Sequence, residues 1–214
     1  MSAEAKPKSS SPEAFAEALR RSPALLGLGF SLDPSRLERL SRYLAELDRW
    51  RRSVNLTGRL SPSQLADHAA ESALGAAEIP PNARVVDIGS GGGLPGVPVA
   101  VLREDASVTL LEPRSRRAEF LRHVLRSLPL ENARVLEERV ETLEPESYDA
   151  ATLRAVGHLP RVVGRARFLV PGGLFVLWTT RAEEARRDLP DLEPVSVRSV
   201  PGALRKQIAV FRRR

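Results

Sequence analysis

Short apolar runs alternate with segments of helical periodicity from residue 84 onward. The apolar runs are rich in β-branched residues, which predicts strands rather than helices. In chain order they cover residues 84–88, 107–111, 133–137, 148–153 and 173–178. Between them, apolar positions recur every three or four residues, which predicts helices at 95–103, 115–127 and 158–169.

Two further apolar runs, at 195–199 and 206–212, follow one another with no helical segment between them. Such a pair is typical of an antiparallel hairpin, whereas strands that are separated by helices usually pair in parallel. The pattern therefore predicts an α/β fold. Its sheet is doubly wound and mostly parallel, and an antiparallel C-terminal strand forms its edge.

The segment that precedes the first predicted strand is helical in pattern. One helix carries apolar residues at three- and four-residue steps, and these are Leu37, Leu40, Tyr43, Leu44, Leu47 and Trp50. Another begins at Ser61, a good capping residue, with Pro62 at its first position. His68 and Glu71 lie three residues apart on that second helix, and hence on one of its faces.

Composition along the chain predicts three regions. Residues 1–12 are rich in serine, proline and lysine and have no apolar pattern, which predicts a disordered tail. The helical pattern at 13–82 predicts an N-terminal cap that ends in a rigid Pro-Pro break. Residues 83–214 then form the Rossmann-like domain.

The first predicted strand runs directly into a glycine-rich turn. Gly89, Gly91 and Gly93 leave the turn without side chains, and glycine also tolerates the positive φ angles of a tight turn. The helix that follows begins with unpaired N–H groups aimed at the same crevice. This arrangement predicts a ligand that lies directly against the backbone.

An acidic residue ends the next strand. Val108 to Leu111 lead into Glu112, and at the tip of the second strand a carboxylate accepts hydrogen bonds from ribose hydroxyls. Glu112 and the glycine turn together predict a cofactor that contains a nucleoside.

Two classes of nucleoside cofactor fit this turn. Gly91-x-Gly93-x-x-Gly96 formally matches the dinucleotide fingerprint, which indicates NAD or FAD. Asp87, however, lies inside the strand two residues before the first glycine, and a buried carboxylate there suits a cationic ligand better than a pyrophosphate. S-adenosylmethionine carries an ammonium and a sulfonium group, so we favour this methyl donor and keep a dinucleotide as the alternative.

Composition narrows the function further. The chain has no cysteine, which excludes disulfides, thiolate nucleophiles and cysteine-ligated metals, and its three histidines are too widely spaced for a metal signature. No apolar run approaches the about 20 residues that span a bilayer, and the N-terminus lacks the apolar core of a signal peptide. We therefore expect a cytoplasmic enzyme with no metal and no membrane contact.

The formal net charge is +6, and every basic residue except Lys6, Lys8 and Lys206 is arginine. A guanidinium group bonds phosphate bidentately and stacks on bases, so such a surface suits nucleic acid. A high-GC genome would explain the preference for arginine but not the positive sign. The charge is thus compatible with RNA binding without proving it.

Several motifs together resemble one enzyme family. They are Asn55-Leu56-Thr57, His68-x-x-Glu71-Ser72, the turn from Val86 to Pro98, Arg114-x-x-Arg117-x-x-Phe120-Leu121, Arg139-Val140-Glu141, Arg154-Ala155 and Gln207-Ile208-Ala209-Val210. Across these motifs the chain resembles the bacterial small-subunit ribosomal RNA guanine-N7 methyltransferases, the glucose-inhibited division protein B family.

The resemblance implies a class I methyltransferase that uses S-adenosylmethionine to methylate one guanine of small-subunit (16S) ribosomal RNA, either free or within the small ribosomal subunit. The cofactor-binding residues expected are Gly89, Gly91, Leu94, Glu112, Val140, Glu141 and Arg154. The substrate-binding residues expected are Asn55, His68, Glu71, Ser72 and Arg139. Arg154, at the carboxyl end of a predicted strand, and Arg139 are expected to orient the reacting groups.

Three positions depart from the family pattern. Glu71 stands where the family usually has aspartate, and Leu153 stands where it has serine. After the fifth strand, where the family tends to carry Lys-Gly, residues 178–180 read Trp-Thr-Thr. The missing lysine bears on RNA contact, and Arg181 is a candidate to replace it.

The N7 atom of guanine carries a lone pair and no proton, so its methylation needs no general base. Catalysis then rests on alignment of the nucleophile, the methyl carbon and the sulfur, an effect of up to about 7–11 kcal/mol. The fourth strand ends without the Asp/Asn-Pro-Pro-aromatic motif that binds an exocyclic amine, which agrees with ring-nitrogen methylation. Two alternatives stay open: a small-molecule methyltransferase of the same fold, and a non-catalytic RNA-binding assembly factor.

Overall fold

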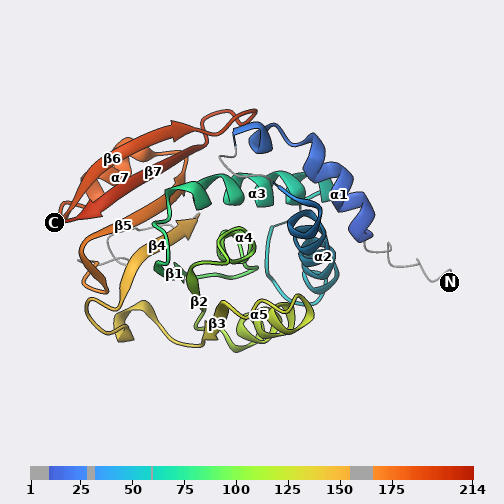
Figure 1. Cartoon of the computed structure of the whole chain (residues 1–214), viewed down its shortest axis with the longest axis horizontal. Coiled ribbons are helices and arrows are strands. Elements are labelled where there is room, and N and C mark those ends of the chain that lie inside the picture. Colours follow the sequence, from blue (N-terminus) through green and yellow to red (C-terminus); the bar gives the residue numbers. More distant parts are fainter. Residues whose placement is uncertain (1–9, 28–31, 59, 155–165) are drawn as a thin grey trace, which may run out of the picture.

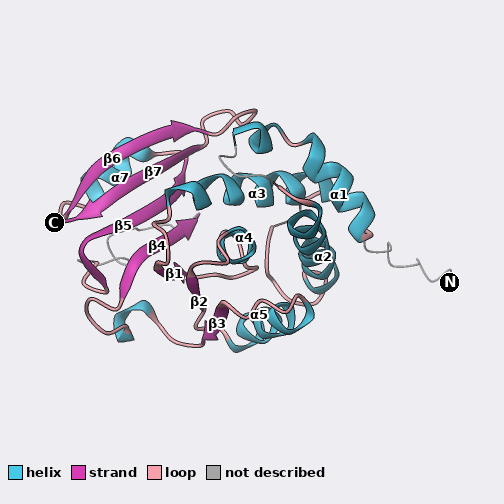
Figure 2. Cartoon of the chain, in the orientation of Figure 1, coloured by secondary structure: helices cyan, strands magenta, loops and turns pink. Residues whose placement is uncertain are grey.

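One sheet runs through the centre of the protein, as the ribbon views show (Figure 1, Figure 2). The computed structural model describes residues 10–27, 32–58, 60–154 and 166–214. Within these residues the sheet has seven strands, in the order β3-β2-β1-β4-β5-β7-β6. The strands are β1 Arg84–Ile88, β2 Ser107–Leu111, β3 Ala133–Leu136, β4 Tyr148–Arg154, β5 Leu169–Thr179, β6 Leu192–Ser199 and β7 Gln207–Arg213.

Strands β1 to β5 pair in parallel, and β7 is antiparallel to both of its neighbours, β5 and β6. The predicted α/β fold with an antiparallel C-terminal strand is therefore confirmed. The expectation that this strand forms the edge is wrong, because β7 lies between β5 and β6. Residues Ile208–Phe211 of β7 are all buried, whereas most of β6 is exposed, so the apolar strand takes the interior position.

The N-terminal region consists of α1 Pro12–Arg21, α2 Pro34–Trp50 and α3 Pro62–Leu74, with short 3-10 segments η1 Pro23–Gly27 and η2 Gly75–Glu78. Each α-helix begins in the same way. Ser11, Asp33 and Ser61 accept a hydrogen bond from a backbone N–H of the first turn, and a proline follows each of them. Proline suits this position because its missing N–H would have no helical partner there.

The predicted N-terminal tail extends too far along the chain. Residues 1–9 lie outside the described part, but Ser11 caps α1 and Pro12 is its first residue. The backbone N–H of Ser10 also donates to the carboxylate of Asp48 on α2. Capping chemistry, rather than apolar periodicity, marks where this helix begins.

The remaining helices are α4 Gly96–Leu102, α5 Ser115–Ser127 and α7 Ala182–Asp188, with a 3-10 turn η3 Val140–Thr142. The short, charged α7 was not predicted. Most of the helix predicted at 158–169 lies outside the described residues, and its last residue is wrong, because Leu169 begins β5. β5 also starts four residues earlier than predicted, since a register shift in its pairing with β4 accommodates Pro171 and two glycines within the strand.

The N-terminal helices and the sheet share one hydrophobic core. The larger apolar cluster contains Phe15 and Leu44 from the helices together with Val85 from β1. The smaller cluster contains Val86, whose side chain points to the opposite face of the sheet, and includes two alanines of α7. No described helix is long and apolar enough to cross a membrane.

Arg103, directly after α4, holds the connection between the helices and β1. Its guanidinium donates to the backbone carbonyls of Ala76, Ile79 and Pro80 and pairs with Asp105. The side chain is 8% exposed, so these contacts are shielded from water. The ion pair lowers the pKa of the Asp105 carboxyl well below its usual range, through the hydrogen bond from the guanidinium.

Replacement of Arg103 should destabilise the whole chain. In Arg103→Met, the carbonyls of Ala76, Ile79 and Pro80 lose a charged donor, and each buried acceptor that is left unsatisfied costs about 1–3 kcal/mol. Urea denaturation should show this loss in the free energy of unfolding. The control Arg21→Met removes an exposed ion pair with Glu17 and should cost less than about 1 kcal/mol. Equal losses in the two variants would contradict this role for Arg103.

Candidate functional site

The glycine turn after β1 has an open side. Gly89 and Gly91 have positive φ angles of 69° and 55°. A Cβ added to Gly89 would meet no atom within 4 Å, and one added to Gly91 would meet only the carbonyl of Gly89 at 3.6 Å and the guanidinium of Arg117 at 3.8 Å. The backbone at these two glycines is therefore accessible to a ligand, as the sequence predicts.

The other two glycines of the motif serve packing. A Cβ on Gly93 would lie 2.7 Å from the side chain of Val97, and one on Gly96 would overlap Leu110 and the carboxylate of Asp87. Gly96 thus lets α4 approach β2 and β1 closely. These contacts explain the Gly-x-x-Gly spacing without a pyrophosphate, so the dinucleotide fingerprint is not needed to account for it.

Asp87 fixes the turn from below. It is fully buried, and its carboxylate accepts hydrogen bonds from the hydroxyl of Thr152 at 2.8 Å and from the backbone N–H of Gly96 at 3.2 Å. Burial raises the pKa of Asp87 to about 6, although these donors act in the opposite direction. The carboxylate therefore places a negative charge beneath the turn while it holds the start of α4.

Glu112 fixes the turn from the side. Its two carboxylate oxygens accept hydrogen bonds from the backbone N–H groups of Gly91 and Arg114, both at 2.9 Å, and the side chain is almost fully buried. Each carboxylate oxygen has a second lone pair, so Glu112 can still accept hydrogen bonds from ribose hydroxyls. An open glycine backbone beside this acceptor fits a nucleoside cofactor.

The segment after β3 lies beside Glu112. The backbone N–H of Glu112 donates to the carbonyl of Leu136, the last residue of β3, so both strands end at the same edge. Val140 is half-buried and Glu141 is exposed in η3, just beyond this edge. The side chain of Arg139 is exposed as well. These positions are compatible with the predicted adenine-binding segment.

The turn from Asn55 to Thr57 packs against the glycine turn from the other side. A Cβ on Gly92 would lie 3.1 Å from the carbonyl of Leu56, and the hydroxyl of Tyr43 donates to the carbonyl of Gly92 at 2.6 Å. Asn55 itself is exposed. The Asn-Leu-Thr turn thus lies against the glycine turn, and Leu94 is half-buried against the larger apolar cluster.

Arg154, the last residue of β4, reaches across to α3. One terminal nitrogen donates to the carbonyl of His68 at 2.7 Å and to the hydroxyl of Ser72 at 2.9 Å, and the other donates to the carboxylate of Glu71 at 2.9 Å. The side chain of Arg154 is 12% exposed, and burial lowers the pKa of its guanidinium. We call this set of contacts the Arg154 clamp.

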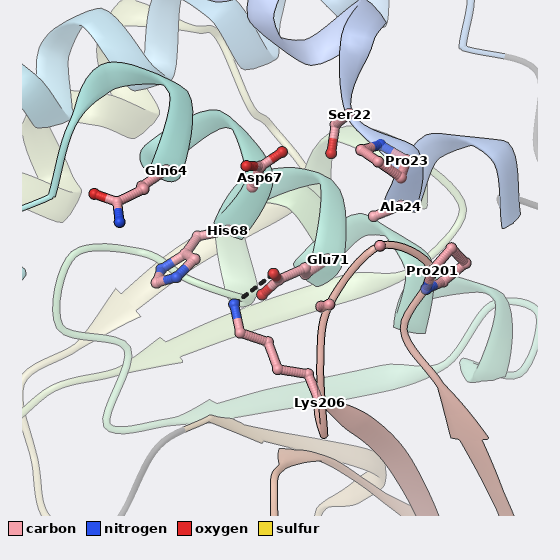
Figure 3. A pocket seen from close by; sticks show the side chains of 11 residues that line it. Ser22, Pro23, Ala24, Gln64, Asp67, His68, Glu71, Pro201 and Lys206 are labelled. Carbon is pink, nitrogen blue, oxygen red and sulfur yellow. Dashed lines mark hydrogen bonds and ion pairs between the residues drawn. The ribbon is translucent and has the colours of Figure 1, made fainter.

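Glu71 is the centre of the clamp. Its second carboxylate oxygen accepts a hydrogen bond from the ammonium of Lys206 at 2.6 Å, and its backbone carbonyl accepts one from the indole of Trp178 at 2.6 Å (Figure 3 shows the pair with Lys206). Gly75 leaves room for Trp178, because a Cβ there would overlap the indole ring. Glu71 therefore connects α3 to β4 and to the turn before β7 through its carboxylate, and to β5 through its backbone carbonyl.

The imidazole of His68 is neutral. Burial, together with the nearby charges of Arg154 and Lys206, lowers the pKa of His68 to about 3. A neutral ring offers one donor and one acceptor rather than a positive charge. Any contact of His68 with RNA is thus a hydrogen bond or a stacking contact, not an ion pair with phosphate.

The comparisons with known proteins identify the family. The family model described as "rRNA small subunit methyltransferase G" matches residues 36–201, which include the glycine turn and the Arg154 clamp. The chain belongs to this family. The family resemblance predicted from the sequence motifs is therefore confirmed, as is the methyl donor, S-adenosylmethionine.

Two curated relatives of that name illustrate the match. The protein from Xanthomonas euvesicatoria pv. vesicatoria is 39% identical over 145 residues, which are 67% of this chain and 68% of the relative. The protein from Stenotrophomonas maltophilia is 35% identical over 197 residues, which are 89% of this chain and 91% of the relative. The family likeness thus extends through the N-terminal helices as well as the sheet.

Solved structures support the fold. A SAM-dependent O-methyltransferase from Thermotoga maritima aligns with a TM-score of 0.57 at 16% identity, over 78% of this chain and 71% of that one. A predicted O-methyltransferase from Agrobacterium tumefaciens aligns with a TM-score of 0.55 at 22% identity, over 66% of this chain and 80% of that one. At these identities the likeness concerns the class I methyltransferase fold alone.

The structure brings together four of the residues that the family motifs predict, namely His68, Glu71, Ser72 and Arg154. Arg139 and Asn55 make no hydrogen bond or ion pair with the clamp in the described part of the chain, and both are exposed. Among the described residues, no group of three or more His, Asp or Glu side chains is placed to hold a metal ion.

Sequence reasoning missed Trp178 and Lys206. A signal for Lys206 existed, because it is the one lysine outside the first eight residues. Arg181, the candidate to replace the family lysine, is 72% exposed and pairs with Glu184 on α7. The ammonium beside the Arg154 clamp belongs to Lys206, from the turn before β7, which pairs with Glu71.

Gly89 provides a test of the cofactor site. Gly89→Ala should weaken S-adenosylmethionine binding at least tenfold, because the new methyl group would stand in the space of the ligand. Calorimetric titration measures this change. Gly172→Ala is a matched control, since Gly172 has a similar φ of 79° and equal space around it, so both variants lose about 1–2 kcal/mol of stability to backbone strain. Normal affinity in Gly89→Ala would remove the glycine turn from the site.

The low pKa of His68 predicts how stability depends on pH. In the unfolded chain His68 binds a proton near pH 6.5. In the folded chain its pKa is about 3, so it stays neutral to a much lower pH. This group's stabilisation is complete above pH 6.5 and is lost as the pH falls toward 3. Between pH 7 and pH 5, the melting temperature of the wild type should therefore fall more steeply than that of His68→Gln. Parallel declines would show that His68 is protonated in the folded protein.

Proposed function

We propose that this protein transfers the methyl group of S-adenosylmethionine to N7 of a guanine in 16S ribosomal RNA. The match of the family model across residues 36–201 carries the proposal, because it includes both the cofactor turn and the Arg154 clamp. We place the reaction in the cytoplasm, on free RNA or on the small ribosomal subunit.

The chemistry makes few demands on side chains. When bound, the cofactor supplies an electrophilic methyl group on a sulfonium centre. The N7 lone pair forms the new N–C bond as the C–S bond breaks, and no proton is transferred. This chain therefore has to bind and orient the cofactor and the guanine and to exclude water. The neutral His68 and the fully paired Glu71 are consistent with the absence of a general base.

The proposed roles follow from position. Glu112 accepts hydrogen bonds from the ribose, and the turn at Gly89 and Gly91 lies against the amino-acid part of the cofactor. Val140 and Glu141 bind the adenine through their backbone. Arg154 is a positioning residue in this proposal, because the described contacts of its guanidinium go to α3.

Exposed arginines near the same edge favour RNA as the substrate. Arg139 follows β3, and Arg114 and Arg116 stand at the start of α5, all three exposed. Guanidinium groups around the mouth of a cofactor site attract the phosphate backbone, and Asn55 is placed to contact a nucleotide on the opposite side.

Methylation of small ribosomal subunits tests the proposal. Subunits from a strain that lacks this activity should gain N7-methylguanosine at one position when incubated with the protein and labelled cofactor. RNA binding should weaken steeply with salt, and Arg139→Ala should reduce the slope of log K against log salt by about 1 through the loss of one phosphate contact. Arg187→Ala, which removes an exposed arginine from α7, is the control and should keep the wild-type slope.

Each alternative gives a different result. RNA binding without transfer of label would indicate a non-catalytic assembly factor. Binding that is independent of salt, with no label in RNA, would indicate a small-molecule methyltransferase. Label on an atom other than N7 of guanine would show that the protein is a methyltransferase but that the proposed target atom is wrong.

A further inference from the structure

A separate cavity lies along the face of α3 that carries Gln64, Asp67, His68 and Glu71 (Figure 3). Its volume is about 300 Å³, and η1 and the turn between β6 and β7 form its other walls. These α3 positions recur at three- and four-residue steps, so they share one face, while the intervening positions such as Leu65 are buried in the core. None of the lining residues belongs to the glycine turn, to the tip of β2 or to η3.

Short side chains make up the apolar walls of this cavity. They belong to Pro23, Ala24, Pro201, Gly202 and Ala203. Two prolines and small residues leave a smooth space that suits a flat ring better than a branched or flexible ligand.

Polar groups in the cavity wall have unused hydrogen-bonding capacity. The hydroxyl of Ser22 is the one buried side-chain polar atom without a partner in the described part of the chain. Gln64 uses its carbonyl oxygen to accept from the N–H of Ser61, which leaves its amide N–H groups. The carboxylate of Asp67 receives no hydrogen bond or ion pair among the contacts of the described residues, although it is only half-exposed. Unsatisfied groups of this kind point to a ligand.

An ammonium group complements the carboxylate. Lys206 donates one N–H to Glu71 and keeps two for other acceptors. In Figure 3, Asp67 projects from α3 above the cavity and Lys206 extends from the turn below it. The site therefore offers the two oxygens of the Asp67 carboxylate to one edge of a ligand and the ammonium of Lys206 to another.

We propose that this cavity binds a guanine base of the RNA substrate that is held but not methylated. Guanine is the one standard base with two adjacent N–H donors, N1–H and the N2 amino group, and these match a carboxylate such as Asp67 bidentately. Its O6 and N7 acceptors on the neighbouring edge match an ammonium such as Lys206. Single-stranded bases in RNA are recognised by such contacts between flat walls.

The bound guanine is distinct from the reacting one for two reasons. The lining of this cavity includes none of the residues of the glycine turn, and Arg154, which is not part of the lining, holds the wall that His68 and Glu71 form. In addition, an ammonium that occupies the N7 lone pair would block its methylation. The proposal rests on RNA being the substrate, and it adds a second point of sequence recognition.

Nucleotide binding tests the cavity without any turnover. The full chain, saturated with S-adenosylhomocysteine to fill the cofactor site, is titrated calorimetrically with GMP, IMP and AMP. GMP should bind, IMP should bind about tenfold more weakly because it lacks the N2 amino group, and AMP should show no saturable binding. Asp67→Asn should lower the GMP affinity about tenfold, and Asp188→Asn, at an exposed position on α7, should leave it unchanged.

Steady-state methylation of small ribosomal subunits tests the role in substrate binding. Asp67→Asn should raise KM for the subunit about tenfold and leave kcat within twofold, since the contact is the same in ground and transition states. Melting curves establish that both variants are folded. Equal affinity for GMP and AMP, or GMP binding that Asp67→Asn does not change, would overturn the guanine site. A fall in kcat at unchanged KM would overturn the claim that this guanine does not react. A wild type that fails to methylate the subunit contradicts the proposed function, and the GMP titration still decides the cavity.

Discussion

The negative charge of Glu71 is buried between α3 and the sheet, and a lone carboxylate in that position would strongly favour unfolding. Two cations that are far away in the sequence neutralise it, Arg154 from the end of β4 and Lys206 from the turn before β7. Because each cation comes from a different part of the sheet, the charge fixes α3 across the carboxyl ends of the strands. The wall of the cofactor site and that of the second cavity both follow from this placement.

Local signals in the sequence predict most of the secondary structure and half of the site. Strand and helix periods, the Ser-Pro helix starts and the glycine turn all depend on interactions within a few residues. Glu112 was found in the same way, since the tip of the second strand is a position that the fold itself defines. The positive φ angles at Gly89 and Gly91 are the local property for which glycine is needed.

Long-range properties were not predictable in the same way. Arg154 lies 86 residues from His68 along the chain, and Lys206 lies 135 residues from Glu71. No rule of sequence spacing connects residues so far apart. The departure at Trp178 from the family pattern is explained only when Gly75 is seen to lie against the indole. The order of the last two strands depends on which of them is buried in the folded sheet. Pro171, Gly172 and Gly173 resemble a loop in the sequence, because a bulge inside a strand carries the same residue types as a turn.

The place of β7 between β5 and β6 restricts how the chain assembles. β6 is synthesised before β7. In the folded sheet, however, the edge of β5 pairs with β7 and not with β6. Formation of the β6–β7 hairpin before docking resolves this conflict, because the hairpin then presents β7 to β5 as a unit. Lys206 lies in the turn of that hairpin, so the same docking event brings the second cation to Glu71, beside Arg154. A chain in which this hairpin has not docked therefore lacks the second of the two ion pairs of Glu71, which disfavours partly folded forms that already resemble the enzyme.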